Sequence, residues 1–92
     1  MTQSIEETLK ERGARYGRFV DHAEVTTQLF KAAFLTLDGA QGRLSADQFE
    51  ALHMIFHKIG RIIAGDPNYA DSWHDIAGYA QLVADRLNGV ER

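Results

Sequence analysis

The sequence predicts an all-α fold, a small bundle of about four helices. Apolar residues recur at three- and four-residue steps, and helix-capping residues stand before several of these segments. Clusters of Gly, Asp, Pro and Asn separate the segments. The chain has 92 residues, 45% of them apolar, which suits one domain, residues 1–92, with a marginal core. Because small helical chains often gain stability by self-association, we expect a homo-oligomer.

The first helix is expected to begin at Ser4. Ser4 and Glu7 have the spacing of a capping box, and Ile5 begins a thin apolar stripe. Gly13 and Gly17 follow, and we expect the helix to loosen there because glycine disfavours helix interiors.

Residues 12–18 form a short basic segment with Arg12, Arg15, Tyr16 and Arg18. We favour a solvated turn. The alternative is a phosphate-contacting segment, because guanidinium groups and exposed backbone N–H groups both bind anions.

The second helix is predicted from Asp21 or His22 to about Thr36, followed by a loop over residues 37–45. His22 is expected at the surface or beside the cap. The predicted buried face consists of Phe19, Val25, Leu29, Phe30, Ala33, Phe34 and Leu37.

The third helix has the strongest signals. Ser45 and Gln48 form a capping box, and the helix should stop at Gly65, before Asp-Pro-Asn at 66–68. Its predicted apolar stripe is Phe49, Leu52, Ile55, Phe56, Ile59, Ile62 and Ile63.

The fourth helix is predicted to begin at Asp71 or Ser72 and to end at Asn88, before Gly89. Its predicted buried face is Trp73, Ile76, Ala77, Ala80, Val83 and Leu87.

Composition excludes several classes of function. The net charge of −3 gives no basic field for nucleic acid. The chain has no cysteine, so it has neither disulfides nor thiolate metal ligands, which agrees with a cytoplasmic protein. No apolar run approaches the roughly 20 residues that span a bilayer, and residues 1–13 are too polar for a secretory signal. We therefore expect no membrane partner.

Ionisable side chains gather around the turn between the third and fourth helices. Three interpretations compete. The first is a metal site formed by His53, His57 and Asp75, because histidines four residues apart share a helix face. Lys58 and Arg61 stand beside these ligands and oppose a dication, so this is the weakest of the three.

The second interpretation is an anion or nucleotide site. Lys58 and Arg61 would bind phosphate, and an aromatic ring would stack on a base. The candidate ligand-binding residues are Lys58, Arg61, Asp71, Trp73, Asp75, Tyr79, Arg15 and Tyr16.

The third interpretation, which we favour, is structural. Lys58 and Arg61 would form ion pairs with Asp71 and Asp75 across the turn. We predict no catalytic residue, because the sequence has no nucleophile elbow and no phosphate-binding glycine loop.

The segments RYGRFVDHAE (15–24) and HKIGRIIAGDPNYADSWHDIAGYAQLV (57–83) resemble a family of small phage and prophage proteins of unknown function. The features in common are Tyr-Gly at 16–17, Lys-Ile-Xaa-Arg at 58–61 and Asp-Ile-Ala-Gly-Tyr at 75–79. The resemblance covers most of the chain. It implies an α-helical protein acting in the cytoplasm of a bacterial host, and it supplies no activity.

More distantly, the layout is similar to MazG-type nucleoside triphosphate pyrophosphohydrolases. Asp75 would match the aspartate of their Glu-Xaa-Xaa-Asp motif, but Ser72 stands where that motif has glutamate. Their Glu-Glu-Xaa-Xaa-Glu helix is replaced here by a segment with His53, His57, Lys58 and Arg61. Mg²⁺ would be a cofactor only if this activity were retained, and no other cofactor is predicted.

The sequence thus favours a non-enzymatic phage accessory protein, a binding or interaction module whose partner is a host protein or a nucleotide. The alternative is a nucleotide-binding or degenerate MazG-like pyrophosphohydrolase.

Overall fold

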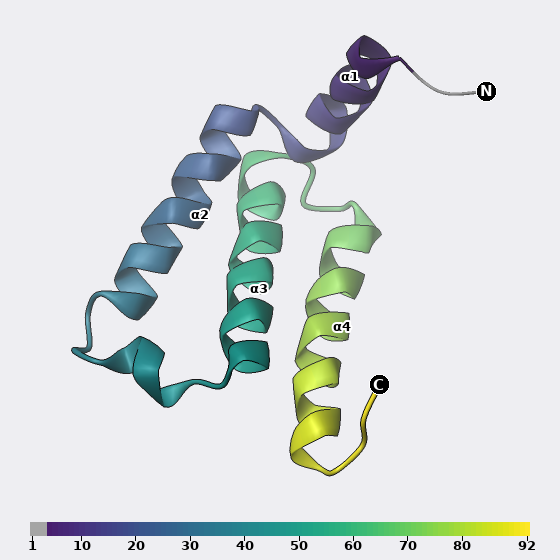
Figure 1. Cartoon of the computed structure of the whole chain (residues 1–92). Coiled ribbons are helices and arrows are strands. Elements are labelled where there is room, and N and C mark those ends of the chain that lie inside the picture. Colours follow the sequence, from purple (N-terminus) through teal and green to yellow (C-terminus); the bar gives the residue numbers. More distant parts are fainter. Residues whose placement is uncertain (1–3) are drawn as a thin grey trace.

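A computed structural model describes residues 4–92, which form four α-helices and one short 3-10 helix and contain no strand. The predicted all-α fold is confirmed. The elements are α1 (Ile5–Tyr16), α2 (Phe19–Phe34), η1 (Ala40–Arg43), α3 (Ala46–Ala64) and α4 (Ala70–Leu87). The helices α2, α3 and α4 lie side by side with α3 in the middle, and α1 extends from one end of this layer (Figure 1). No helix within residues 4–92 has the length and apolarity to cross a membrane.

The start of α2 and α4 and the course of α1 differ from the prediction. The helix α1 continues through Gly13 to Tyr16 and ends at Gly17, which has a φ of 77°. The helix α2 begins at Phe19, without a side-chain cap. The helix α4 begins at Ala70, because the backbone N–H of Tyr69 bonds to the Asp66 carbonyl and turns the chain before the predicted caps.

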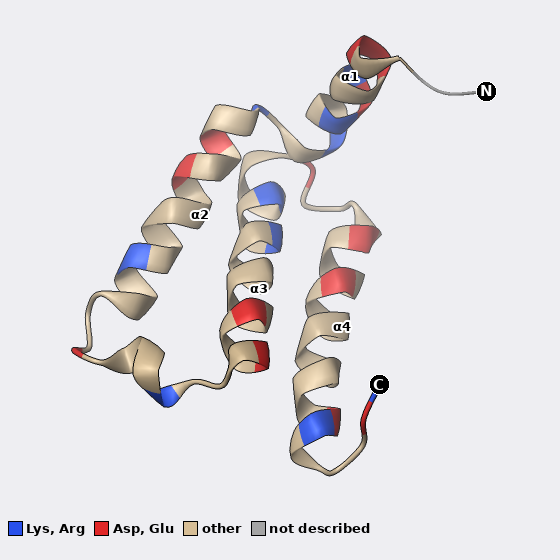
Figure 2. Ribbon diagram, in the orientation of Figure 1, with Lys and Arg blue, Asp and Glu red and all other residues tan. Residues whose placement is uncertain are grey.

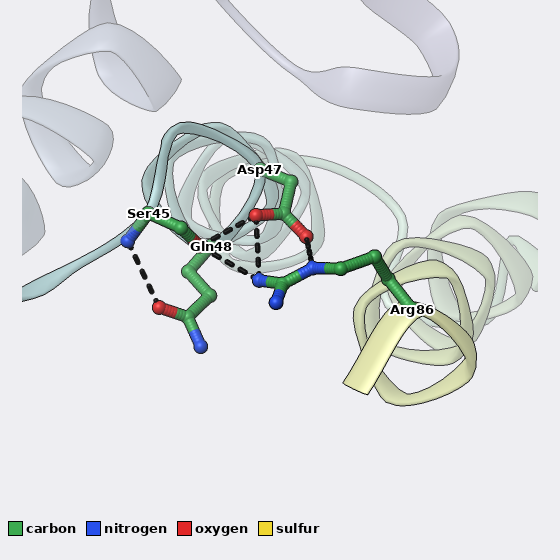
Figure 3. Close-up of polar contacts among 4 residues, drawn as sticks. All are labelled: Ser45, Asp47, Gln48 and Arg86. Carbon is green, nitrogen blue, oxygen red and sulfur yellow. Dashed lines mark hydrogen bonds and ion pairs between the residues drawn. The ribbon is translucent and has the colours of Figure 1, made fainter. Parts of the chain in front are cut away.

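The predicted capping box of α3 is confirmed. The Ser45 N–H donates to Gln48 Oε1 at 3.0 Å, and the N-cap serine is also bonded by Arg86 of α4 (Figure 3). Arg86 binds Asp47 through both Nε and Nη2, each at 2.8 Å. These bonds hold the pKa of Asp47 well below its usual value. The start of α3 is therefore fixed to the last turn of α4.

A second ion pair joins α3 to α4 nearer the other end. Lys58 Nζ lies 3.1 Å from Asp75 Oδ2, as the structural interpretation predicted, and Lys58 is only 9% exposed. Figure 2 shows acidic residues in the first half of α3 and basic residues in its second half, whereas α4 begins acidic and has Arg86 in its last turn. Because the helices are antiparallel, opposite charges face each other at both ends.

The helices α2 and α3 approach closely at Gly60. A Cβ atom there would lie 2.5 Å from Thr26 Oγ1 and 2.8 Å from the His22 carbonyl oxygen. Farther along this interface, Phe34 packs against Phe49 and Phe56, with ring centroids 5.0 and 5.9 Å apart.

The core is thin. Within residues 4–92 the buried apolar side chains are Phe34, Ala51 and Ile62. Besides Ala33, Ala77 and Ala80, three large residues predicted on the buried faces of α2 and α4 are exposed: Phe19 by 73%, Trp73 by 56% and Leu87 by 59%. Leu37, also predicted as buried, lies beyond the end of α2 and is exposed. A layer one helix thick leaves two broad faces uncovered, which is why these predictions of burial are wrong.

Candidate anion-binding site

The link between α1 and α2 crosses the end of α3 at two glycines. A Cβ atom on Gly17 would lie 2.1 Å from the Ala64 carbonyl oxygen, and one on Gly65 would lie 2.3 Å from the Tyr16 carbonyl carbon. The backbone N–H of Asp66 donates to the Arg15 carbonyl at 2.8 Å. This crossing places the basic segment, residues 12–18, against the last turn of α3.

Two arginine–tyrosine contacts follow from the crossing. The guanidinium of Arg61 stacks on the ring of Tyr16, with Cζ 4.2 Å from the ring centroid. Arg15 turns the other way, toward Tyr69, and donates from Nη1 to the Tyr69 hydroxyl at 2.8 Å. That hydroxyl in turn donates to Asp71 at 2.9 Å. Arg15 is thus held by Tyr69, which directly precedes α4 and whose ring also packs against Tyr16. On its other side, Tyr16 lines a cavity together with Arg61.

The cavity lies between α1, the start of α2 and the end of α3, and has a volume of about 560 Å³. Its lining includes three guanidinium groups, those of Arg12, Arg18 and Arg61, and no carboxylate from residues 4–92. The ion pairs found in the described chain do not involve these three arginines. The complete lining is Leu9, Arg12, Gly13, Tyr16, Gly17, Arg18, Phe19, Val20, His22, His57 and Arg61.

Two histidines lie at the inner side of the cavity, 5.3 Å apart between ring centroids. His22 is 5% exposed, so its predicted surface position is wrong. Burial, and then the charge of Arg61, lowers the pKa of both histidines, that of His57 to about 4. Both imidazoles are therefore neutral near pH 7, because a second positive charge beside Arg61 in a desolvated position is unfavourable.

Two buried nitrogens in this region have no hydrogen-bond partner among residues 4–92: Nδ1 of His22 and Nε of Arg61. Unsatisfied buried polar atoms are rare in folded proteins, and these two nitrogens are available for a hydrogen bond to a bound molecule. A cavity of this size, with three cations, two neutral imidazoles and the rings of Tyr16 and Phe19, has the chemistry to bind an anion with an attached aromatic group.

The other predicted ligand-binding residues lie elsewhere. Lys58 is engaged by Asp75, and the indole N–H of Trp73 donates to the Pro67 carbonyl at 2.8 Å. Asp75 and Tyr79 line a different hollow of about 550 Å³ along α4, together with His74. The structure therefore brings Arg61 and Tyr16 together and connects them to Arg15 and Asp71 through Tyr69, whose ring lies 5.9 Å from that of Tyr16. Lys58, Trp73, Asp75 and Tyr79 lie apart from this group.

The three residues proposed as weak candidates for metal ligands also pack against different partners. His53 packs against Phe30 and Phe49, His57 packs against His22, and Asp75 pairs with Lys58. No group of three or more His, Asp or Glu residues within residues 4–92 is arranged to hold a metal ion. Mg²⁺ requires several oxygen ligands, whereas Asp75 faces an ammonium group and Asp71 accepts from the Tyr69 hydroxyl. These residues do not fit a magnesium site.

The cavity contains residues outside the predicted set: Arg12, Arg18, Phe19 and His22. The two arginines belong to the segment that the sequence marked as basic. His22 had a local signal, because it stands three residues after Phe19 and three before Val25, which are both on the predicted buried face.

Residues 1–87 match a family described as a domain of unknown function (DUF6378). No curated protein and no solved structure matches the chain.

Proposed function

Since the chain belongs to this domain family of unknown function, we propose from its cavity that it is a non-enzymatic binding module for a phosphate-bearing ligand of the nucleotide class. The observation that carries the proposal is the lining of three guanidinium groups without a described carboxylate. Such a concentration of positive charge is unfavourable unless solvent or an anion neutralises it.

The positions of the lining residues suggest which part of the ligand each would contact. Arg12 and Arg18 flank the α1–α2 link, and Arg61 reaches the same space from α3. These groups would bind the phosphates, because the planar guanidinium fork matches phosphate oxygens. Phe19 is 73% exposed and is available to stack on a base.

The MazG-like alternative has less support. Asp75 is paired with Lys58, and Ser72, at the position of the motif glutamate, is 3% exposed. The phage or prophage setting, and with it a bacterial cytoplasm, rests on the resemblance of the Tyr-Gly, Lys-Ile-Xaa-Arg and Asp-Ile-Ala-Gly-Tyr segments. A cytoplasmic accessory protein that binds nucleotides is compatible with that setting.

The test is isothermal titration of nucleoside triphosphates and of inorganic triphosphate, each without added metal. We expect binding by the unmodified chain and a loss of about 100-fold or more in affinity for the Arg12→Gln/Arg18→Gln variant, because each of the two charged hydrogen bonds contributes about 1.5–3 kcal/mol. The matched control is Arg43→Gln, which removes an exposed arginine from η1, outside the cavity lining.

Tighter binding of the nucleotide than of inorganic triphosphate would show that the aromatic residues of the cavity contact the base. Equal affinities for the nucleotide and for inorganic triphosphate would show that the cavity recognises the phosphates alone. Absence of binding at millimolar concentration, or equal losses in the control and the double variant, would overturn the proposal.

A further inference from the structure

One face of the three-helix layer is apolar and lies opposite the cavity. On α3 and α4 a groove of about 300 Å³ marks this face, lined by Leu44, Gln48, Ala51, Leu52, Ile55, Ala80 and Val83. The stripe continues at helical steps to Ile59 and Ile63 on α3 and to Trp73 and Leu87 on α4. We call this surface the apolar face.

Helical geometry separates the apolar face from the cavity. Ile59 and Ile63 each stand two residues from Arg61, which is about half a turn around α3. The two surfaces therefore belong to opposite sides of the layer.

The apolar face is uncharged over a long stretch. The stripes on α3 and α4 contain no Asp, Glu, Lys or Arg, and the two ion pairs between these helices involve residues outside those stripes. Its most exposed members are Ile63 at 67%, Leu87 at 59% and Trp73 at 56%. Groups of exposed apolar side chains of this kind mark interaction sites on soluble proteins.

The chain exposes more surface than a compact monomer of its size, by an amount large enough for one side of a standard interface. The accessible surface is 6729 Å², whereas a compact monomer of 10.3 kDa exposes about 5,400 Å². The radius of gyration is 15.3 Å, against about 12 Å for a compact domain of this length. The excess surface, about 1,300 Å² per chain, exceeds the roughly 800 Å² that each partner buries in a standard interface.

We propose that a second copy of this chain covers the apolar face. In a two-fold symmetric pair each surface meets itself, so a charged face would bring like charges together, whereas an uncharged one does not. The pair would bury Trp73, Ile63 and Leu87, which the sequence places on apolar stripes and the single chain leaves in solvent. It would leave the cavity on the outer side of each copy. This inference does not depend on the proposed ligand.

The test is sedimentation equilibrium of the full chain from low micromolar to about 100 µM protein. We expect a dimer for the unmodified chain and for Leu82→Lys, and a shift of at least about 100-fold toward monomer for Ile63→Lys, since a buried unpaired charge is strongly unfavourable. Leu82 is the matched control, because it is 50% exposed and, nine residues from Trp73, stands about half a turn around α4 from the apolar stripe. Circular dichroism checks that both variants are helical.

Trp73 is the single tryptophan and supplies a second measurement on the unmodified protein. Its emission should shift to longer wavelength when dilution dissociates the dimer and exposes the indole, a result that remains decisive if Ile63→Lys fails to fold. A monomeric mass at every concentration, or a dimer in which Trp73 emission does not change on dissociation, would overturn the proposal. So would a dimer that Leu82→Lys disrupts and folded Ile63→Lys does not.

Discussion

His57 illustrates how one side chain connects folding with the candidate site. Its ring packs on His22 and lies close enough to Arg61 to be affected by that charge. Burial and Arg61 lower its pKa from 6.5 to about 4. The folded chain therefore keeps His57 neutral at a pH where the unfolded chain protonates it. A bound phosphate would oppose this effect by favouring the charged imidazolium.

The free energy of unfolding should consequently depend on pH. Between pH 6.5 and about 4 the unfolded chain binds a proton at His57 that the folded chain excludes, so stability falls as the pH falls through this window and is fully present above it. Urea denaturation at several pH values measures the effect. His57→Gln should flatten the dependence, whereas His74→Gln, at an exposed position on α4, should not.

Lys58 is the most buried of the charges that join α3 to α4, and Asp75 is its ion-pair partner. Asp75→Asn leaves this ammonium group without its counter-charge, and we expect a loss of about 1–3 kcal/mol in the free energy of unfolding. Lys58→Met should be tolerated better, because it removes the buried charge together with the need for a partner.

Chemical denaturation compares these variants with Asp71→Asn, one turn earlier on α4. Asn at position 71 still offers an oxygen to the Tyr69 hydroxyl, so its stability should hardly change. An equal loss for the two Asp→Asn variants would contradict the importance of the Lys58 pair.

At the scale of elements, the contacts of α3 with α2 and with the basic segment determine which residues line the cavity. The approach at Gly60 brings His22 beside α3, and the crossing at Gly17 and Gly65 brings the basic segment beside Arg61. Local sequence could predict α3 because Ser45, Gln48 and Gly65 act within a few residues of the helix ends. It could not predict which side of α3 the segment 12–18 would contact, because that depends on packing between distant residues, such as Arg15 and Asp66, which stand 51 positions apart.

Gly60→Ala should destabilise the chain by about 1–3 kcal/mol, because the new methyl group overlaps Thr26 Oγ1 and the His22 carbonyl oxygen. Gly78→Ala is the matched control on α4. A Cβ atom there has no neighbour within 4 Å in the described chain, so alanine should stabilise the helix by up to about 1 kcal/mol. Thermal denaturation followed by circular dichroism distinguishes the two. Equal effects would show that α2 can move away from α3 without loss.

At the scale of the whole molecule, the sequence predicted four helices and the helical stripes but not their surroundings. Trp73 and Leu87 lie on a regular stripe, which is typical of a buried face, yet both are more than half exposed in the single chain. Periodicity shows that a surface is suited to burial and does not show what covers it. The same limit applied to Arg61, which was expected near Asp71 and Asp75 and instead stacks on Tyr16.

The position of the cavity on the side of the layer opposite the apolar face has a consequence for valency. A pair joined through the apolar face would present two cavities directed away from each other, so one small ligand could not contact both. Each ligand would bind its own copy, with a stoichiometry of one per chain. Two sites on one scaffold would nevertheless raise the avidity for any surface or polymer that displays the phosphate group repeatedly, without a new contact in either cavity.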